Sequence, residues 1–300
     1  MYRKILVGYD DSDQSKDALV LGKQLADATG AELVVAGVFP FDPLWGGLDP
    51  HFHEEEAEYA RKIVAAAKSV GAEAEAFPSS SAARGLHELA EEIAADLILV
   101  GSAHYGRVGQ AVAGSVGVAL LHGSPCAVGV ASRGYRERSG QDLGAIAVGV
   151  DGSDEARVAL EAACELASHT GAKLKLVAVA EHPVVGTGKG GAEGWHELKE
   201  AIEQMMRERL TEARDSVPEG IEVDTSLVSG DPAKALIDAA GGPGTLLMVG
   251  SRAYGPLRRV LLGSVSTRLV RLALCPVIVT PRGMHAGADA ASRAAVKAAS

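Results

Sequence analysis

Two stretches of the chain decide its fold, because they repeat each other: residues 97–116, LILVGSAHYGRVGQAVAGSV, and residues 246–265, LLMVGSRAYGPLRRVLLGSV. In each stretch an apolar run ends in Gly-Ser, a loop follows, and a second Gly-Ser opens an amphipathic segment. Both Gly-Ser pairs are offset by 149 residues (250 − 101 and 263 − 114), and so are Cys126 and Cys275 (275 − 126). A constant offset at three separate landmarks is not expected by chance, so the sequence indicates a duplicated unit.

A further match marks the start of each copy. Residues 4–10, KILVGYD, correspond to residues 145–151, AIAVGVD, at an offset of 141 (151 − 10). The second copy therefore carries a net insertion of 8 residues (149 − 141), part of which we place in the Gly-rich loop 182–194. We expect a first domain over 1–131, a polar linker over 132–142, a second domain over 143–282 and a disordered tail over 283–300.

Within each copy, short apolar runs alternate with amphipathic segments. The pattern predicts strands near 4–9, 32–38, 73–77, 97–101 and 126–130, and near 145–150, 173–179, 221–227, 245–249 and 276–280. It predicts helices near 14–29, 53–70, 83–94 and 113–122, and near 155–169, 195–215, 232–240 and 262–272, with Ser153 as an N-cap. Strands that are apolar on both faces and separated by helices favour the α/β class, with two tandem doubly wound parallel sheets.

The last predicted strand of each copy is apolar: CAVGV at 126–130 and CPVIV at 275–279. Each would lie at a sheet edge, and an apolar edge needs a partner. Because both edges belong to one chain, each is present at a high effective concentration for the other. We therefore expect the two copies to pair through these strands as a pseudo-dimer within the chain.

Composition excludes several classes of protein. The chain has 300 residues, a net charge of −10 and 4% aromatic residues, which argues against a wide nucleic-acid or anionic-membrane surface and against base stacking. Three dispersed cysteines, Cys126, Cys164 and Cys275, do not form a disulfide framework and fit a reducing cytosol. With no signal-peptide pattern and no long apolar run, we expect a cytoplasmic protein.

The glycine loops carry the chemical signal. Backbone N–H groups at a helix N-terminus favour an anion, and glycine lets the backbone approach a phosphate closely. Gly114-Ser115 and Gly263-Ser264 each open a predicted helix, but no Gly-Lys-Ser/Thr follows, so this is not a Walker loop. The alternative is that the glycines only permit tight strand-to-helix packing. Asp10 and Asp151, each ending the first strand of its copy, favour nucleotide binding because they would face the same crevice.

At this point the sequence resembles the universal stress protein family, over about residues 2–282. The family pattern G-x2-G-x9-G-[S/T] matches Gly250, Gly263 and Ser264, and equally Gly101, Gly114 and Ser115, while its second glycine is replaced by Ala253 and His104. The segment 230–233, Gly-Asp-Pro-Ala, also looks like this family. The resemblance implies a Rossmann-like fold of the adenine nucleotide alpha hydrolase type and ATP as ligand, alone or with Mg²⁺.

The resemblance also implies roles for single residues. Asp10 and Asp151 would meet the ribose or adenine, Val38 and Val179 would line the adenine pocket, and the amides of Val116 and Val265 would bind phosphate. Gly106 and Gly255 would supply the flexibility of the missing glycine. The predicted nucleotide-binding residues are Asp10, Val38, Gly101, Gly106, Gly114, Ser115 and Val116 in the first copy, and Asp151, Val179, Gly250, Arg252, Gly255, Gly263, Ser264 and Val265 in the second.

Other charged residues leave alternatives open. Arg252, Arg258 and Arg259 suit a phosphate clamp but equally suit a solvated surface. His51 and His53 lack a second ligand pair at zinc spacing, so we predict no metal site.

No catalytic constellation is visible in the sequence, so we expect a binding protein and not an enzyme. In this reading the chain is an ATP-binding stress or regulatory protein, which could form a further homodimer. Two alternatives stay open: a slow ATPase or nucleotidyl-transfer enzyme, and a scaffold that has lost its ligand.

Overall fold

The computed structural model describes residues 2–40, 50–102, 115–181, 192–242, 244–251 and 263–281. The first copy contains β1 (Lys4–Gly8), α1 (Asp13–Thr29), β2 (Glu32–Pro40), α2 (Pro50–Val70), β3 (Glu73–Ser79), α3 (Ala82–Glu92), β4 (Leu97–Gly101), α4 (Ser115–Leu120) and β5 (Ala127–Ala131). The second contains β6 (Ala145–Val150), α5 (Asp154–Thr170), β7 (Lys173–Ala180), α6 (Ala192–Asp215), β8 (Val223–Ser229), α7 (Pro232–Ala240), β9 (Thr245–Gly250), α8 (Ser264–Leu272) and β10 (Val277–Thr280).

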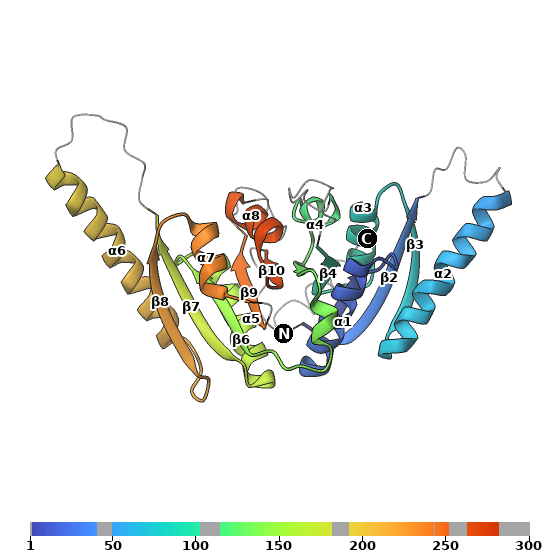
Figure 1. Cartoon of the computed structure of the whole chain (residues 1–300), viewed down its shortest axis with the longest axis horizontal. Coiled ribbons are helices and arrows are strands. Elements are labelled where there is room, and N and C mark those ends of the chain that lie inside the picture. The colour runs from blue at the N-terminus through green and yellow to red at the C-terminus, as the bar shows by residue number, and fades with distance from the viewer. Residues whose placement is uncertain are drawn as a thin grey trace, which may run out of the picture.

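These strands form one ten-stranded sheet in the order β3-β2-β1-β4-β5-β10-β9-β6-β7-β8 (Figure 1). All strand pairs within a copy are parallel. Each copy is wound outward from its first strand in both directions, which confirms the predicted α/β class and the tandem Rossmann-like fold.

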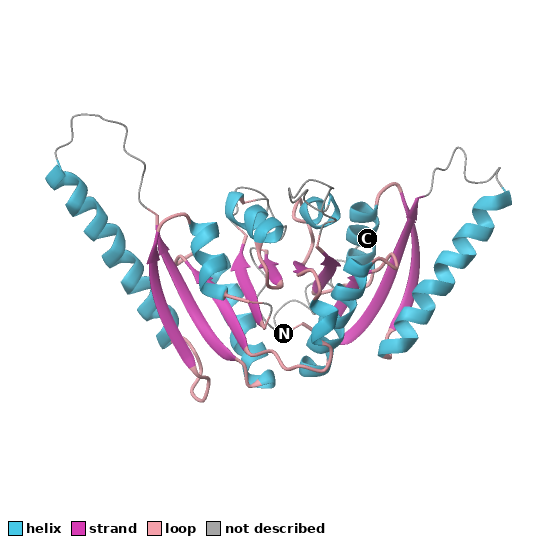
Figure 2. Cartoon of the chain, in the orientation of Figure 1, coloured by secondary structure: helices cyan, strands magenta, loops and turns pink. Residues whose placement is uncertain are grey.

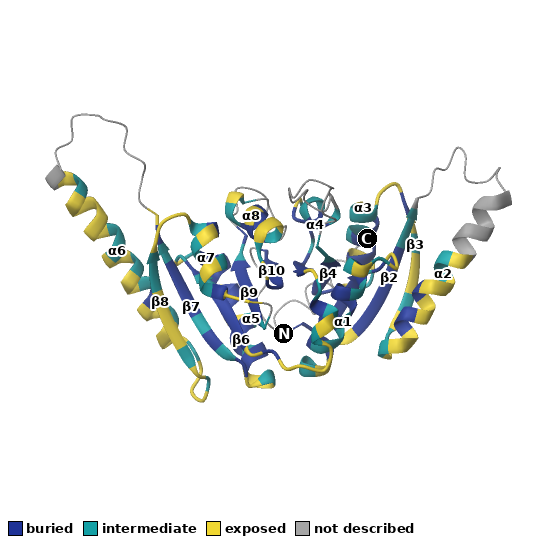
Figure 3. Ribbon diagram, in the orientation of Figure 1, coloured by how far each residue is buried: buried dark blue, intermediate teal, exposed yellow. Residues whose placement is uncertain are grey.

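Helices cover both faces of the sheet (Figure 2). The helices α1, α2, α5 and α6 pack on one face, and α3, α4, α7 and α8 pack on the other. Strand β1 shows why its residues are apolar throughout: Ile5 and Val7 belong to the first core, Leu6 belongs to the second, and all three are fully buried. Figure 3 shows this buried centre along the strands. Among the described residues, no helix is both long and apolar enough to cross a membrane.

The first helices of the two copies, α1 and α5, begin and end in the same way. Each has 17 residues. The hydroxyl of Ser12 accepts a hydrogen bond from the Ser15 amide, and Ser153 does the same for Ala156, which confirms Ser153 as the N-cap. Gly30 and Gly171 end the helices in the left-handed region, at φ of 70° and 69°.

The two copies meet at β5 and β10, which are the only antiparallel pair among the described strands. Val130 lies opposite Val277, and Val128 lies opposite Val279. This confirms the expected pairing of the last strands. Each copy thereby removes the apolar edge of the other, because both edge strands gain a hydrogen-bonded neighbour.

The outermost strands, β3 and β8, differ from the prediction that every strand is covered on both faces. Most of their residues are exposed or half-buried. Their sequences, EAEAFPS and VDTSLVS, carry polar residues that suit a solvated edge. On β7, the Lys173 ammonium lies 2.8 Å from Glu222 and 2.7 Å from Asp224, which places charge along the β8 edge.

The polar segment between the copies is held firmly against α1. It contains a short 3-10 helix, η1 (Tyr135–Arg138). The buried carboxylate of Asp17 accepts hydrogen bonds from the amides of Gly134 and Arg136, both at 2.9 Å. Tyr135 is 1% exposed and donates its hydroxyl to Gln24. The linker is therefore a packed part of the first copy and not a free tether.

Candidate functional site

The strand order creates a switch point in each copy. From β1 the chain moves to β2 on one side, and it later returns to β4 on the other side. In the second copy β6 lies between β7 and β9 in the same way. Ligands of open α/β sheets bind beyond the carboxyl ends of the strands at such a point. The predicted residue Asp10 lies two positions after the end of β1 and Asp151 directly follows β6, while Gly101 and Gly250 end β4 and β9.

The two aspartates occupy equivalent turns. Oδ1 of Asp10 accepts hydrogen bonds from the amide of Ser12 at 3.1 Å and from its hydroxyl at 2.5 Å. Oδ1 of Asp151 accepts the same pair of bonds from Ser153, at 3.0 and 2.5 Å. Each carboxylate is thus fixed at the start of a helix by one oxygen. The other oxygen, Oδ2, has no hydrogen bond within the described part of the chain, so it can accept one from a ligand hydroxyl.

The glycines at the ends of β4 and β9 have a clear packing role. A Cβ atom on Gly101 would lie 2.2 Å from the carbonyl oxygen of Gln14, in the first turn of α1. A Cβ atom on Gly250 would lie 2.5 Å from the carbonyl carbon of Glu155, in the first turn of α5. The packing alternative therefore accounts for these two residues, whether or not they also approach a phosphate.

The residues after these glycines were not among the predicted site residues. The hydroxyl oxygens of Ser102 and Ser251 are buried and have no hydrogen-bond partner among the described residues, although the Ser251 amide donates to the Thr280 carbonyl at 2.8 Å. A buried hydroxyl without a hydrogen bond lowers the stability of the folded state. Its repetition in both copies therefore needs an explanation. The only sequence signal was the repeated Gly-Ser pair itself.

The start of α8 offers backbone donors. Gly263 is the N-cap residue and provides no side-chain hydrogen bond to the first turn. The hydroxyls of Ser266 and Thr267 donate to the Gly263 carbonyl at 3.2 and 2.8 Å, so they do not use the first-turn amides. Ser264 is exposed and Val265 is half-buried. The first-turn amides are therefore available to an anion.

The comparisons with known proteins decide the family. A model of the universal stress protein family matches residues 1–132 and again residues 144–281. This chain belongs to that family. A universal stress protein of Mycolicibacterium smegmatis is 29% identical over 294 residues, covering 93% of this chain and 97% of its own length. One from Bacillus subtilis is 32% identical over 140 residues, which is 44% of this chain and 95% of the relative.

Solved structures give the same result. The crystal structure of a universal stress protein from Archaeoglobus fulgidus matches with a TM-score of 0.64 and 25% identity, over 94% of this chain and all (100%) of that one. The match spans both copies, so the tandem arrangement is shared with a family member.

The remaining predicted residues of this universal stress protein fall into two groups. Val38 on β2 and Val179 on β7 are half-buried and pack against the core beneath α3 and α7, while Val116 lies in the first turn of α4. Gly106, Gly114, Arg252 and Gly255 lie outside the described residues, as do Arg258, Arg259 and the side chains of Ser115, His51 and His53. Their proposed roles stay predictions.

The described residues contain no group of three His, Cys, Asp or Glu side chains that could hold a metal ion. The three cysteines are buried and free. Burial raises the pKa of the Cys164 and Cys275 thiols to about 11, so both remain protonated at neutral pH. A protonated, buried thiol is a poor nucleophile, which agrees with an apolar packing role.

Proposed function

We propose that this universal stress protein binds ATP at its switch points and acts as a cytoplasmic regulatory protein. The observation that carries the proposal is the buried Ser251 hydroxyl, which is 0% exposed and unpaired among the described residues at the carboxyl end of β9. A ligand phosphate or hydroxyl would give it a partner. Ser102 repeats this arrangement in the first copy.

Two further features support the same ligand. Oδ2 of Asp151 can accept a hydrogen bond from a ribose hydroxyl, as the carboxylates of dinucleotide-binding folds do. The uncapped first turn of α8 can bind a phosphate through its amides. ATP would thus be held by Asp151, Ser251 and the segment 263–265, and equivalently by Asp10 and Ser102 in the first copy.

The test begins with the protein as purified. We expect denaturation to release an adenine nucleotide that mass spectrometry identifies, and calorimetry to show that Ser251→Ala weakens ATP binding by roughly three- to tenfold, the loss of about one hydrogen bond. Ser216→Ala is the control, since within the described part of the chain its hydroxyl bonds only the Ala213 carbonyl on α6. No nucleotide and no ATP binding would favour the scaffold that has lost its ligand.

A second assay separates binding from turnover. We propose binding without rapid hydrolysis, because no catalytic lysine of the Walker type follows the glycine loops. Steady-state phosphate release measured with saturating ATP would then stay at background. Sustained release that Ser251→Ala abolishes would instead favour the slow ATPase.

A further inference from the structure

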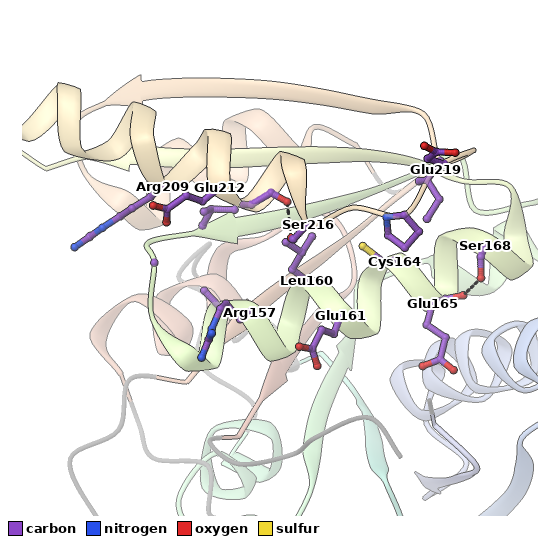
Figure 4. Close-up of a pocket in the computed structure, with 16 residues that line it drawn as sticks. Arg157, Leu160, Glu161, Cys164, Glu165, Ser168, Arg209, Glu212, Ser216 and Glu219 are labelled. Carbon is purple, nitrogen blue, oxygen red and sulfur yellow. Dashed lines mark hydrogen bonds between the residues drawn. The ribbon is translucent and has the colours of Figure 1, made fainter. Parts of the chain in front are cut away.

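A cavity in the second copy begins beside Asp151, since Val150 and Gly152 line it, and extends away from the switch point between two helices. It has a volume of about 700 Å³ and runs between α5 and α6, from the end of β6 to the turn that joins α6 to β8 (Figure 4). We call it the α5/α6 groove. Its size falls within the usual range of small-molecule sites, roughly 300–1,000 Å³.

The floor of the α5/α6 groove is apolar. Val150, Leu160 and Cys164 are buried there, at 6%, 4% and 7% exposure. Ala213 from α6 and Ile221 from the following turn complete the floor. Such a surface favours the hydrocarbon part of a ligand over water.

The rim of the groove carries both signs of charge, and its two cations are held at one end. Arg157 forms an ion pair with Asp154, and Nη1 of Arg209 donates to the Asp151 carbonyl oxygen at 2.6 Å. Both arginines lie toward the β6 end of the groove (Figure 4).

The carboxylates on the rim are differently placed. Besides Glu165 on α5, three carboxylates line the rim: Glu161 from α5, Glu212 from α6 on the opposite side, and Glu219 from the turn at the far end (Figure 4). None of the three forms an ion pair within the part of the chain that the structure describes. Their negative charge is therefore available to a cation that enters the groove.

We propose that the α5/α6 groove is a second ligand site, which takes a small organic cation with an apolar body, such as a protonated amine on a hydrocarbon chain. The apolar part would cover Leu160, Cys164 and Ala213, and the ammonium group would lie at the rim, where the negative charge of Glu161, Glu212 and Glu219 favours a cation. The β6 end of the groove borders Asp151, whereas the proposed ligand contacts lie farther along α5 and α6, so the proposal does not rest on ATP binding.

The apolar floor and acidic rim of the α5/α6 groove are specific to the second copy, as a comparison with the first copy shows. Helices α1 and α5 align at an offset of 141, set by their C-cap glycines (171 − 30). At that offset Glu161 corresponds to Val20, and Cys164 corresponds to Lys23, which pairs with Asp27. A cationic side chain thus stands where the second copy has a floor residue, so we expect one ligand per chain.

The experiment uses n-octylamine, n-octanoate and n-octanol, which share one apolar body, with the full chain at pH 7. Calorimetry is expected to show octylamine binding at one site per chain, at least fivefold more tightly than octanol and tenfold more tightly than octanoate. No saturable octylamine binding, or octanoate binding as tightly as octylamine, would overturn the proposal.

Variants locate the site. The combined change Glu161→Gln, Glu212→Gln and Glu219→Gln is expected to weaken octylamine at least fivefold and leave octanol unchanged. Glu197→Gln, Glu200→Gln and Glu208→Gln, which remove equal charge from α6 outside the groove, should leave octylamine binding unchanged. Equal weakening by both triple variants would refute the site. All six changes lie at charged positions on the surface or groove rim, so folding is retained and is checked by circular dichroism.

Discussion

Gly250 at the end of β9 and Glu155 in the first turn of α5 are packed so closely that a methyl group on the glycine would lie 2.5 Å from the carbonyl carbon of Glu155. Gly101 and Gln14 repeat this contact in the first copy. In each copy a strand therefore ends against the backbone of the helix that carries the N-cap serine. Backbone atoms cannot rotate away as a side chain can, so the glycine is required by packing alone.

Gly250→Ala tests this contact. We expect it to lower the free energy of unfolding by about 1–3 kcal/mol, because the methyl group forces α5 away from β9. Urea unfolding is the measurement. Gly194→Ala in α6, where no atom lies within 4 Å of the added methyl group, should instead be neutral or stabilise the protein by about 0.5–1 kcal/mol. Equal midpoints for the two variants would contradict the packing role.

Asp151→Ala is expected to weaken ATP binding by about 1–3 kcal/mol, because a charged acceptor is lost. The sequence alone predicts that this variant leaves the fold intact, but the structure adds a cost of about 1 kcal/mol in stability, since Ser153 loses its acceptor. Asp151→Asn is the matched control: its Oδ1 keeps the bonds to Ser153 and only the charge is removed. Calorimetry should place the ATP affinity of Asp151→Asn between those of wild type and Asp151→Ala. If both variants bind ATP as tightly as wild type, Asp151 does not contact the nucleotide.

The second copy is expected to hold ATP more tightly than the first. Its helix α8 has 9 residues, whereas α4 has 6, and its loop carries Arg252, Arg258 and Arg259 where the first has Arg107. The comparison is Gly263→Val against Gly114→Val, with bound nucleotide quantified after denaturation. We expect Gly263→Val to remove more ATP. If Gly114→Val removes more while both variants stay folded, the ranking is reversed.

Asp17→Ala is expected to destabilise the protein by about 3 kcal/mol. The side chain is buried, and its loss leaves the amides of Gly134 and Arg136 without an acceptor. Asp13→Ala provides the control, because Asp13 also pairs with Arg136 but is 67% exposed, which makes its pair worth well under 1 kcal/mol. Chemical denaturation distinguishes them, and two equally small effects would show that the linker is not anchored by Asp17.

Tyr59 gives a prediction for alkaline pH. Burial, with the charge of Asp10 adding to it, raises the pKa of Tyr59 to about 12, from the ordinary 10.0. The folded protein therefore keeps the phenol proton where the unfolded chain loses it. This contribution to stability is complete below pH 10 and falls as the pH rises toward 12.

Urea unfolding at pH 8, 10 and 11 is the measurement. Tyr59→Phe should be less stable than wild type by about 1 kcal/mol at pH 8, because it loses the hydroxyl's hydrogen bond to the Tyr9 carbonyl at 3.0 Å, and the difference should shrink above pH 10, where the wild type falls more steeply. An identical alkaline slope in wild type and variant would contradict the prediction. The slope does not vanish in the variant, because burial also raises the pKa of Tyr9 to about 12.

The sequence by itself determined the duplication, the α/β class, the Ser153 cap and the pairing of β5 with β10. Local sequence patterns predict these features: apolar runs of strand length, a serine before an acidic first turn, and two apolar edge strands that each need a neighbouring strand. The position of Asp10 and Asp151 at the ends of the first strands of the two copies also followed from the pattern, because a strand end is marked by the change from apolar to polar residues.

Only the tertiary structure decided which distant groups meet. Asp17 anchors an amide 117 positions away, Gly250 at the end of β9 packs against Glu155 in the first turn of α5, and the α5/α6 groove combines residues from two helices and a turn. The unpaired hydroxyls of Ser102 and Ser251 are likewise visible only once their surroundings are packed. A sequence pattern records the preference of each segment, whereas burial and unpaired polar groups depend on how the segments pack together in space.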